Sequence, residues 1–474
     1  MSQKTKIIAT LGPASESNEM IEKLILSGVN IFRFNLKHNT HEWHENLMNR
    51  VKNIAKNLNK KVAIFADMQG PELRTGIFPN NVKNISLLEG ENILLSAKFD
   101  EKANATWIPF KDVKSVKDLS KGTMIYIDDG KIELEVTKFS DTNIFAVVKG
   151  GGVLGTQKSI SIPNAKINVP TLMPKDISDA KFSIKQKVDF IALSFVRDSA
   201  DIATLRKLIV KEGGNQSIVA KIETLKAIEN IDEIINETDV IMVARGDLGV
   251  EIPIERVPRI QKQLIYKCRL QAKPVIVATQ MLLSMVNNIT PSRAEVADIA
   301  NAVFDKTDCL MLSEETATGA NPDKVASTMS KIARYNEMHE FTDDLSYTPK
   351  SFEEIVIGAS IKFSRKAPSG ESEVKGYIVF TESGKSVRVL SRFRPPLPIY
   401  AFSTHFHVAK QMIISYGTIP YQMKLHKNPV TNTKNALEIL QKDRYIETGD
   451  RLIVIFGNNV GVPEANNTIS IIKA

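Results

Sequence analysis

Cysteine and tryptophan are the scarcest residues in this 474-residue sequence, with two of each. Two cysteines, Cys268 and Cys309, cannot form a disulfide framework, and both lie in apolar or helical contexts. Such scarcity favours reduced thiols and a cytoplasmic protein. No run of about 18 apolar residues is present to span a membrane. The N-terminus runs directly into a strand pattern, so we expect no signal peptide and no membrane partner.

Dense clusters of Lys and Arg with interleaved aromatic residues are also missing, although 62 Lys and Arg outnumber 54 Asp and Glu. This pattern argues against a nucleic-acid partner. A net charge of +8 is sufficient to attract anionic small molecules. The composition, 43% hydrophobic and 24% charged, is that of an ordinary globular protein, and the length suggests about two to four domains.

Eight short apolar segments alternate with helical patterns along much of the chain. They lie at residues 6–10, 30–35, 62–67, 190–195, 217–222, 240–245, 274–279 and 309–313. Repeated strand–helix units predict a parallel sheet, and eight of them predict a closed (β/α)8 barrel of the α/β class. Sites in such barrels form at the carboxyl ends of the strands. Polar residues do fall there: Arg33, Asn35, Asp67, Ser194, Lys221, Glu223, Asp247, Thr279 and Ser313.

Two regions depart from this rhythm. Between the third and fourth strands the sequence alternates with the period of β-structure, which predicts an inserted small β-barrel domain at residues 71–166. The barrel would then comprise residues 1–70 and 167–342. An insertion at the site end of a barrel can close over it as a lid. After a polar linker, residues 343–474 return to strand–helix alternation and predict a C-terminal α/β domain.

A hydroxyl-rich turn in this last region follows one expected strand and begins a helix. It consists of Thr381, Glu382, Ser383, Gly384, Lys385 and Ser386. Backbone N–H groups at such a helix start suit a phosphate. A simple helix cap by Ser383 or Ser386 is the alternative.

Charged residues at two strand ends carry the strongest chemical signal. Strand alternation places Lys221 and Glu223 on one face, and neither can be buried cheaply without partners. Asp247 follows the next strand, just past a glycine. Two carboxylates can hold a divalent cation and a lysine beside them can hold a phosphoryl group, as phosphoryl transfer requires. Singly, these residues could be a surface lysine and helix-capping carboxylates, but their common position favours a site.

Several motifs, in this order, resemble the pyruvate kinase family. They are KTKIIATLGPAS (residues 4–15), GPELRTG (70–76), KIE (221–223), ARGDLG (244–249), ATQM (278–281) and MLSEETA (311–317), with a similar tail at 461–468. The family has a barrel, an inserted lid and a C-terminal α/β effector and oligomerisation domain, in agreement with the segments above. The resemblance implies glycolytic transfer of a phosphoryl group from phosphoenolpyruvate to ADP, giving pyruvate and ATP. It also implies Mg²⁺ or Mn²⁺, a homotetramer and a phosphorylated allosteric effector bound at residues 381–386.

The resemblance further assigns roles to individual residues. Glu223 and Asp247 would hold Mg²⁺, and Lys221 would stabilise the transferring phosphoryl group. Substrate would be bound by Arg33, Ser194, Gly246, Asp247 and Thr279, with Thr279 in the path that delivers a proton to the methyl carbon. Nucleotide or phosphate positions match Asn35, His38, Arg74 and Lys158, the last on the lid.

The monovalent-cation site of the family, here Asn35, Lys37, Asp67 and Met68, is altered. Lys37 replaces a serine, Met68 a threonine, and Gln69 a lysine. An ammonium carries one positive charge and three donors. If the strand continues, Lys37 shares a face with Arg33 and Asn35. We therefore predict that the Lys37 ammonium binds Asn35 and Asp67 in place of K⁺, unless its side chain turns outward to solvent.

Two other functions remain open from the sequence. One is a different Mg²⁺-enolate barrel enzyme, such as a lyase or aldolase that acts on pyruvate-like acids. The other is a catalytically weak relative with a binding or regulatory role, which the altered cation site suggests. The lid lysine and the C-terminal domain argue against the first, and the retained Lys221, Glu223, Asp247 and Thr279 argue against the second.

Overall fold

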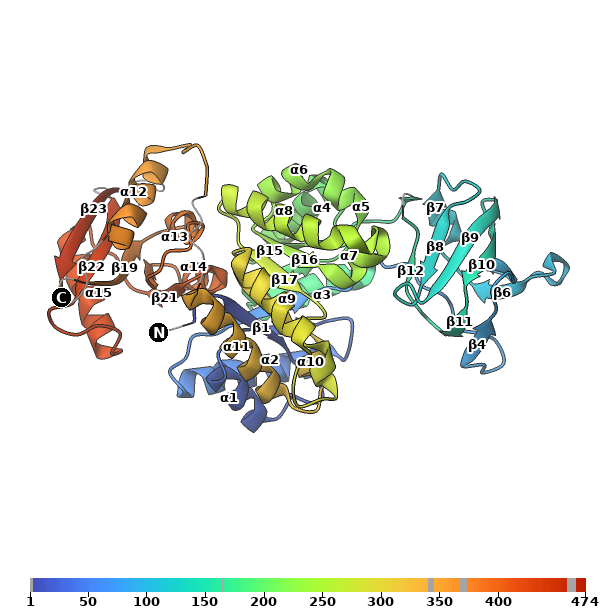
Figure 1. The fold of residues 1–474 in the computed structure, drawn as a ribbon, viewed down its shortest axis with the longest axis horizontal. Coiled ribbons are helices and arrows are strands. Elements are labelled where there is room, and N and C mark those ends of the chain that lie inside the picture. The colour runs from blue at the N-terminus through green and yellow to red at the C-terminus, as the bar shows by residue number, and fades with distance from the viewer. Residues whose placement is uncertain (1–2, 164, 340–344, 367–372, 458–465) are drawn as a thin grey trace.

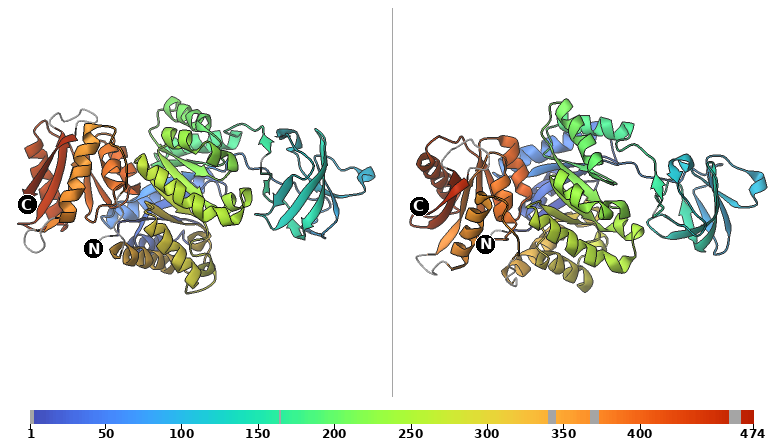
Figure 2. Two further views of the ribbon diagram at one scale, coloured as in Figure 1. Left: turned by 45° about the horizontal axis from the view of Figure 1, so that its top comes forward. Right: turned by 90° about the horizontal axis from the view of Figure 1, so that it is seen from above.

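The computed structural model describes residues 3–163, 165–339, 345–366, 373–457 and 466–474. Three bodies follow one another along the long axis of the molecule (Figure 1). A barrel lies in the middle, the inserted β-domain at one end and the C-terminal domain at the other, and the turned views show the same separation (Figure 2). In the described residues, the helices are too short or too polar to cross a membrane.

Eight parallel strands close the central barrel, as the sequence predicts. They are β1 (Lys6–Thr10), β2 (Val29–Asn35), β3 (Ala63–Asp67), β14 (Phe190–Leu193), β15 (Ser217–Ile222), β16 (Val240–Ala244), β17 (Val275–Ala278) and β18 (Cys309–Leu312). β18 pairs in parallel with β1 and so completes the ring. Each expected strand is present, with small shifts at some ends.

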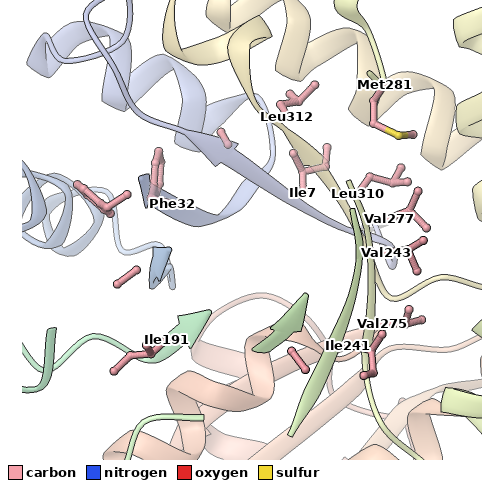
Figure 3. Close-up of a cluster of buried hydrophobic side chains, with 14 of the residues drawn as sticks. Ile7, Phe32, Ile191, Ile241, Val243, Val275, Val277, Met281, Leu310 and Leu312 are labelled. Carbon is pink, nitrogen blue, oxygen red and sulfur yellow. The ribbon is translucent and has the colours of Figure 1, made fainter. Parts of the chain in front are cut away.

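Side chains of these strands alternate between two hydrophobic clusters. Ile8, Met242 and Ile276 fill the barrel interior. Their neighbours Ile241 and Val243 point outward into the layer between strands and helices (Figure 3). Because both faces of each strand are buried, the strands read as continuous apolar runs. Polar residues are therefore informative where they interrupt those runs.

A ring of helices covers the barrel. They are α1 (Asn18–Leu26), α2 (His41–Asn57), α3 (Pro174–Lys185), α4 (Ser199–Lys211), α5 (Leu225–Glu229), α6 (Ile231–Glu237), α7 (Arg245–Glu251), α8 (Val257–Leu270), α9 (Arg293–Phe304), α10 (Glu314–Ala317) and α11 (Pro322–Met338). Two of these helices, α5 and α6, follow one another between β15 and β16. They meet at Asn230, whose side chain donates a hydrogen bond to the backbone oxygen of Arg197 (3.0 Å).

The insertion is a β-domain with its own hydrophobic core. Its strands are β4 (Asn84–Leu87), β5 (Asn92–Ser96), β6 (Thr106–Pro109), β7 (Val116–Lys117), β8 (Met124–Ile127), β9 (Ile132–Phe139), β10 (Asn143–Gly150), β11 (Gly152–Gly155), β12 (Ile160–Ser161) and β13 (Lys166–Ile167). A six-stranded sheet runs in the order β12-β8-β9-β10-β5-β6, beside the pairs β11-β4 and β13-β7. It contacts the barrel at the end of α7, where Ser161 Oγ donates a hydrogen bond to Glu251 Oε1 (2.5 Å).

The C-terminal domain is a five-stranded sheet flanked by helices. The strand order is β21 (Thr418–Gln422), β20 (Ile399–Ser403), β19 (Val374–Phe380), β22 (Arg451–Gly457) and β23 (Asn466–Lys473), with β23 antiparallel to β22. The helices are α12 (Phe352–Lys366), α13 (Lys385–Ser391), α14 (Phe406–Gln411) and α15 (Pro429–Lys442). Most of the family-like tail at 461–468 lies outside the described residues.

The C-terminal domain also closes the amino end of the barrel. Ile413 and Ile414, in a short 3₁₀ turn (Met412–Ile414), pack with the interior side chains of the barrel strands. Cys309 Sγ donates a hydrogen bond to the backbone oxygen of Ile414 (3.2 Å), and the ammonium of Lys6 donates one to the oxygen of Thr418 (2.7 Å). The barrel core is therefore shared between two parts of the chain.

Candidate active site

Lys221 occupies the centre of the carboxyl end of the barrel. Its ammonium lies 2.8 Å from Glu223 Oε1, 2.8 Å from Ser194 Oγ and 3.5 Å from Asp67 Oδ1. Burial lowers the pKa of Lys221, but the charges of Asp67 and Glu223 outweigh it and hold the pKa above its ordinary value. The group is thus a fixed positive charge, on the same face as Glu223, as strand alternation predicts.

Glu223 is a buried carboxylate with strong directional contacts. Its Oε2 accepts a hydrogen bond from the backbone N–H of Phe195 (2.7 Å). Burial, together with the negative charge of Asp247, raises the pKa of Glu223 to about 7 against the opposing charge of Lys221. Since the negative charge of Asp247 acts on Glu223, a cation bound by both carboxylates would relieve their repulsion.

Two residues at the same end of the barrel have a strained backbone. Phe195 and Thr279, just past β14 and β17, have φ values of 54° and 71°. A β-branched residue rarely adopts this region, and the surroundings must enforce it. Thr279 Oγ1 accepts the N–H of Gly246 (2.8 Å), and Arg245 Nη2 donates to the oxygen of Thr279 (2.7 Å). Thr279 is therefore fastened to α7, the helix that carries Asp247.

Arg33 and Asp67 form a close ion pair. Arg33 Nε and Nη2 lie 2.8 Å and 2.6 Å from Asp67 Oδ2, and Nη1 donates to Thr10 Oγ1 (3.0 Å). Burial raises the pKa of Asp67, but the charges of Lys221 and Arg33 lower it below its ordinary value. Asp67 thereby holds two cations in the site.

Lys37 differs from the prediction. Its ammonium lies 2.9 Å from Glu72 Oε2 rather than on Asn35 or Asp67, and its side chain is 31% exposed. The physical reason is local: β2 ends at Asn35, so strand alternation does not extend to Lys37, and Asp67 Oδ2 is taken by Arg33. Asn35 Oδ1 instead accepts the backbone N–H of Lys37 (3.2 Å). The alternative, an ammonium turned outward to solvent, is not observed either.

The residues matched to nucleotide positions form two groups that meet at Arg74, whose backbone bridges to Ser159, the residue after Lys158. Lys37 and Arg74 share one cluster, because both pair with Glu72. Burial, and then the nearby charges of Lys37, Arg33 and Arg74, lower the pKa of His38. Arg74 Nη2 pairs with Glu72 Oε1 (2.7 Å). Lys158 belongs to the inserted domain, where its ammonium lies 2.9 Å from Asp128 Oδ1. The structure brings three of the four residues (Asn35, His38 and Arg74) to the barrel rim.

The turn at residues 381–386 has the expected position between β19 and α13. Thr381 Oγ1 accepts the N–H of Gly384 (3.0 Å), which has a φ of 76°. Ser386 Oγ is bound inside the protein, because it donates to Glu353 Oε1 (2.5 Å) and accepts from Asn466 Nδ2 (2.7 Å). Glu382 pairs with His405 (3.2 Å).

Glu223 and Asp247 fit Mg²⁺ by the chemistry of their donors. Within the described ranges, no group of three or more His, Cys, Asp and Glu side chains is placed to hold a metal. Mg²⁺ prefers oxygen ligands and commonly uses one or two carboxylates, with water and substrate oxygens in its other positions. The pair of carboxylates beside a fixed ammonium therefore matches a metal held jointly with a substrate.

Sequence reasoning missed several residues that support this end of the barrel. Glu315, buried, accepts the N–H groups of Ser313 (2.7 Å) and Leu282 (3.2 Å), and so ties the loops after β17 and β18 together. A carboxylate two residues past an apolar strand could have indicated it. Asp298 pairs with Arg245 (2.7 Å) from α9, and nothing in the sequence links the two.

A closed parallel barrel with a buried lysine and paired carboxylates at its carboxyl end defines the class: an enzyme of phosphoryl transfer. A family model described as "Pyruvate kinase, barrel domain" matches residues 2–326, and one described as "Pyruvate kinase, alpha/beta domain" matches residues 367–472. The chain belongs to the pyruvate kinase family.

Relatives that carry the name pyruvate kinase match the chain from end to end. A protein of Clostridium acetobutylicum is 37% identical over 472 residues, covering 99% of both chains. One of Thermococcus litoralis is 37% identical over 483 residues, covering 100% of this chain and 99% of its own. One of Staphylococcus aureus is 38% identical over 478 residues, covering 99% of this chain and 80% of its own.

Proposed function

We propose that this chain transfers the phosphoryl group of phosphoenolpyruvate to ADP, giving pyruvate and ATP, at the site built around Lys221. Membership of the family makes it a kinase. The observation that carries the site assignment is the buried ammonium of Lys221, 2.8 Å from Glu223 and 3.5 Å from Asp67. An enclosed fixed charge of this kind stabilises the oxygens of a phosphoryl group in transit.

Each neighbouring group has a defined task in this proposal. Glu223 and Asp247 hold Mg²⁺, which supplies charge stabilisation for the oxygen that the departing phosphoryl group leaves behind. Ser194 accepts a hydrogen bond from Lys221 and holds it in place. Arg33, oriented by Asp67, presents its guanidinium to the phosphate.

Thr279 and Gly246 form the end of the site that receives the three-carbon acid. The strained backbone at Thr279 directs its hydroxyl to the N–H of Gly246. The hydroxyl lies in the path that delivers a proton to the methyl carbon, and the backbone at Gly246 and Asp247 receives the carboxylate. Phosphoryl transfer at Lys221 and proton delivery at Thr279 thus occur at the ends of β15 and β17, with β16 and Asp247 between them.

The inserted domain, residues 71–166, is proposed to be a lid on the barrel formed by residues 1–70 and 167–342, with residues 343–474 as the third domain. Arg74 links its two connections to the barrel, because it bridges to Ser159 and donates to the oxygen of Gln157 (2.5 Å). Lys158 would exchange Asp128 for the nucleotide phosphates when the lid closes, which excludes water.

We further propose that the activity of this protein does not require K⁺. Four cations, Arg33, Lys37, Arg74 and Lys221, already pair with Asp67, Glu72 and Glu223. The ammonium of Lys37, paired with Glu72, supplies at the rim of the barrel the positive charge that K⁺ would supply. The contact differs from the predicted one, which was with Asn35 and Asp67. An additional monovalent cation is then not needed for charge balance.

Regulation and assembly complete the proposal. The turn at residues 381–386 would take the phosphate of a sugar phosphate or nucleotide effector, using its backbone N–H groups, while Ser386 stays engaged with Glu353. If so, Ser383→Glu removes the effect of the activating phosphate. We also propose a homotetramer and a cytoplasmic location.

A coupled assay with phosphoenolpyruvate, ADP and Mg²⁺ tests the function. Pyruvate and ATP should form in equal amounts. Formation of pyruvate and inorganic phosphate without ATP would indicate hydrolysis of phosphoenolpyruvate rather than transfer to ADP. A lyase or aldolase that acts on other pyruvate-like acids would not consume phosphoenolpyruvate in this assay. Tight binding of phosphoenolpyruvate without turnover would indicate a regulatory relative.

A further inference from the structure

The inserted domain is joined to the barrel by two connections. One leaves the carboxyl end of β3 and enters the domain through residues 68–73, and the other returns through residues 168–173 to the start of α3. The domain extends away from the barrel along the long axis of the molecule (Figure 1). The contacts of these two connections determine where the chain can bend when the domain moves.

Asp176, in the first turn of α3, binds a backbone N–H of each connection. Its Oδ1 accepts the N–H of Gly70 (3.0 Å), and its Oδ2 accepts the N–H of Met173 (2.9 Å). The residue is fully buried, and burial raises its pKa against the effect of these two hydrogen bonds. We call Asp176 together with the two N–H groups the connection clasp.

The entering connection is closely packed at Gly70. This residue has a φ of 74°, and a Cβ there would lie 2.7 Å from Cβ of Ser194. Glycine alone combines that conformation with so close an approach. Ser194 Oγ in turn lies 2.8 Å from the ammonium of Lys221, so the clasp holds this connection against a residue of the candidate active site.

Further contacts fix the returning connection to the barrel. Arg197 Nη1 donates to the backbone oxygen of Val169 (3.0 Å), and Thr171 Oγ1 donates to Asp201 Oδ1 (2.5 Å). Arg197, just before α4, and Asp201, within it, pair with one another (2.8 Å). Residues 169–173 are therefore bound to α4 as well as to α3.

Beyond these contacts, both connections belong to the inserted domain. The N–H of Ile160 donates to the backbone oxygen of Leu73 (2.8 Å), and the N–H of Asn168 donates to that of Ser115 (2.7 Å). The chain between the two sets of contacts is short, at residues 71–72 on one side and 168–169 on the other. A rotation of the domain as one body has to take place there, because hinges are a few residues that absorb the change in φ and ψ.

We propose that Asp176 is a positioning residue for the reaction, which holds both connections at one point so that the lid rotates about residues 71–72 and 168–169. This inference rests on the proposed role of residues 71–166 as a lid. Two hinges that start from one fixed point define one axis of rotation. Along that rotation Lys158 reaches the nucleotide phosphates, while Ser194 and Lys221 keep their positions.

Asp176→Asn releases one connection, because an amide has one acceptor oxygen where the carboxylate has two. Spin labels on Lys138→Cys in the lid and Asn288→Cys after β17 report the position of the lid by their distance. β17 lies across the barrel from β3 and β14, and the native cysteines Cys268 and Cys309 are buried and should not be labelled. Without ligand, the distance distribution should be broader in Asp176→Asn than in the wild type. Mg²⁺-ADP should shift the wild-type distribution to the closed lid.

Steady-state kinetics distinguishes positioning from a general loss of stability. In Asp176→Asn, KM for ADP should rise about tenfold, since misplacement by about 1 Å can cost about 10²-fold. KM for phosphoenolpyruvate should stay unchanged, because its proposed ligands lie on the barrel. A decrease of kcat by no more than a few-fold is expected, because saturating ADP favours the closed lid.

Asp189→Asn is the matched control. Asp189 is also a buried carboxylate that accepts a backbone N–H, that of Ile64 (2.7 Å), but it lies just before β14, at the opposite end of the barrel. This variant should have a lower thermal midpoint with a wild-type distance distribution and a wild-type KM for ADP. Met173→Pro is the second test variant, because it removes one N–H of the clasp and the φ of Met173, −72°, suits proline. It should broaden the distribution as Asp176→Asn does.

The distances do not depend on turnover, so failure of the clasp and failure of the proposed function can be told apart. Wild-type distributions in both Asp176→Asn and Met173→Pro would overturn the clasp and leave the lid in place. Equal broadening in Asp189→Asn would overturn it too, because the lid would then respond to stability in general. Broadening with an unchanged KM for ADP would contradict a role in the reaction. A wild-type distribution that Mg²⁺-ADP does not shift would contradict the lid, and this inference with it.

Discussion

The two ends of the barrel each bury a lysine, and the two lysines behave in opposite ways. Lys221 contacts the carboxylate of Glu223, and its pKa lies above the ordinary value. Lys6 donates to the backbone oxygen of Thr418, and burial lowers its pKa to about 8 against the opposing effect of Cys309, Glu337 and Asp308. The nature of the acceptor decides the outcome, since only a carboxylate offsets the cost of removing the charge from water.

The residues around the two lysines also differ, because those around Lys221 are charged and those around Lys6 include apolar side chains that close the barrel. Around Lys221 the backbone is strained at Phe195 and Thr279, and charged groups converge. Around Lys6 the barrel is closed by Ile413 and Ile414. One end gathers charged groups, as the proposed chemistry requires, and the other end is filled by apolar side chains.

Lys221→Met should cause the largest loss of activity, because it removes the charged lysine from the carboxyl end of the barrel. Loss of one fixed charge at a phosphoryl-transfer site commonly reduces kcat by about 10²–10³-fold. The matched control is Lys6→Met, the same substitution at the other end, which should keep kcat within a few-fold per folded molecule. The coupled assay, with circular dichroism to verify folding, measures both. Equal losses in the two variants would show that the ends do not differ in function.

Glu223→Gln should weaken binding of a divalent cation by at least about tenfold. Mutation of residues that only hydrogen-bond to a metal ligand already lowers metal affinity by about that factor. Calorimetric titration with Mn²⁺ in the absence of substrate measures it without relying on activity. Glu251→Gln is the control, because that carboxylate, on the same side of the barrel, binds Ser161 rather than a metal. If both variants bind Mn²⁺ as wild type does, the metal assignment fails.

Gly246→Ala tests the substrate end of the site without removing a contact. A Cβ at Gly246 would lie 3.5 Å from Thr279 Oγ1, an ordinary contact, so the fold has room for it. We expect KM for phosphoenolpyruvate to rise about tenfold from crowding of the bound acid. The thermal midpoint should stay equal or increase, because alanine favours a helix over glycine by about 1 kcal/mol. An unchanged KM would place the acid elsewhere.

Lys37→Ser tests whether the lysine at the rim of the site makes activity independent of K⁺. The wild-type protein should turn over at nearly full rate with a bulky organic monovalent cation alone, because Lys37 already balances Glu72. The variant should be several-fold slower and should recover in part with K⁺, as the charge is restored. Lys226→Ser, an exposed lysine paired with Glu229, serves as the control. Strong activation of the wild type by K⁺ is the opposing result.

Lys6→Met should have the smallest effect, a change in how stability depends on pH. The folded-state pKa of Lys6, about 8, is below the ordinary 10.5, so the unfolded state binds more protons between these values. The contribution of Lys6 is therefore unfavourable below about pH 8 and improves as pH rises toward 10. Urea unfolding at pH 7.5 and 9.5 should show wild type gaining stability relative to the variant. A parallel pH dependence would mean that Lys6 stays charged.

The sequence predicted those features that depend on local pattern. Apolar runs gave all eight barrel strands, and alternation carried one residue past the end of β15 gave the contact between Lys221 and Glu223. The partner of Lys37 could not be predicted in this way, since Glu72 is 35 residues away in the connection to the inserted domain. Its position depends on where β2 ends and on which carboxylate Arg33 has already engaged.

Contacts between residues far apart in the chain could not be predicted from the sequence either. Ile413 and Ile414 look like core residues of their own domain, and they instead complete the barrel interior. Lys158 carries the right residue type for a nucleotide, but its pairing with Asp128 depends on the fold of the inserted domain. Residue type predicts what a group can do, whereas its actual partner is set by tertiary geometry.

Closure of the barrel by Ile413 and Ile414 has a consequence for how proteins of this architecture can be recombined. A C-terminal domain exchanged between two relatives must fit its 3₁₀ turn into the interior of a foreign barrel, at a depth where both isoleucines are only 3% exposed. Close packing tolerates little mismatch in volume. The C-terminal domain therefore cannot be exchanged by itself. A chimera that folds must take the 3₁₀ turn and the barrel strands that pack against it from the same parent protein.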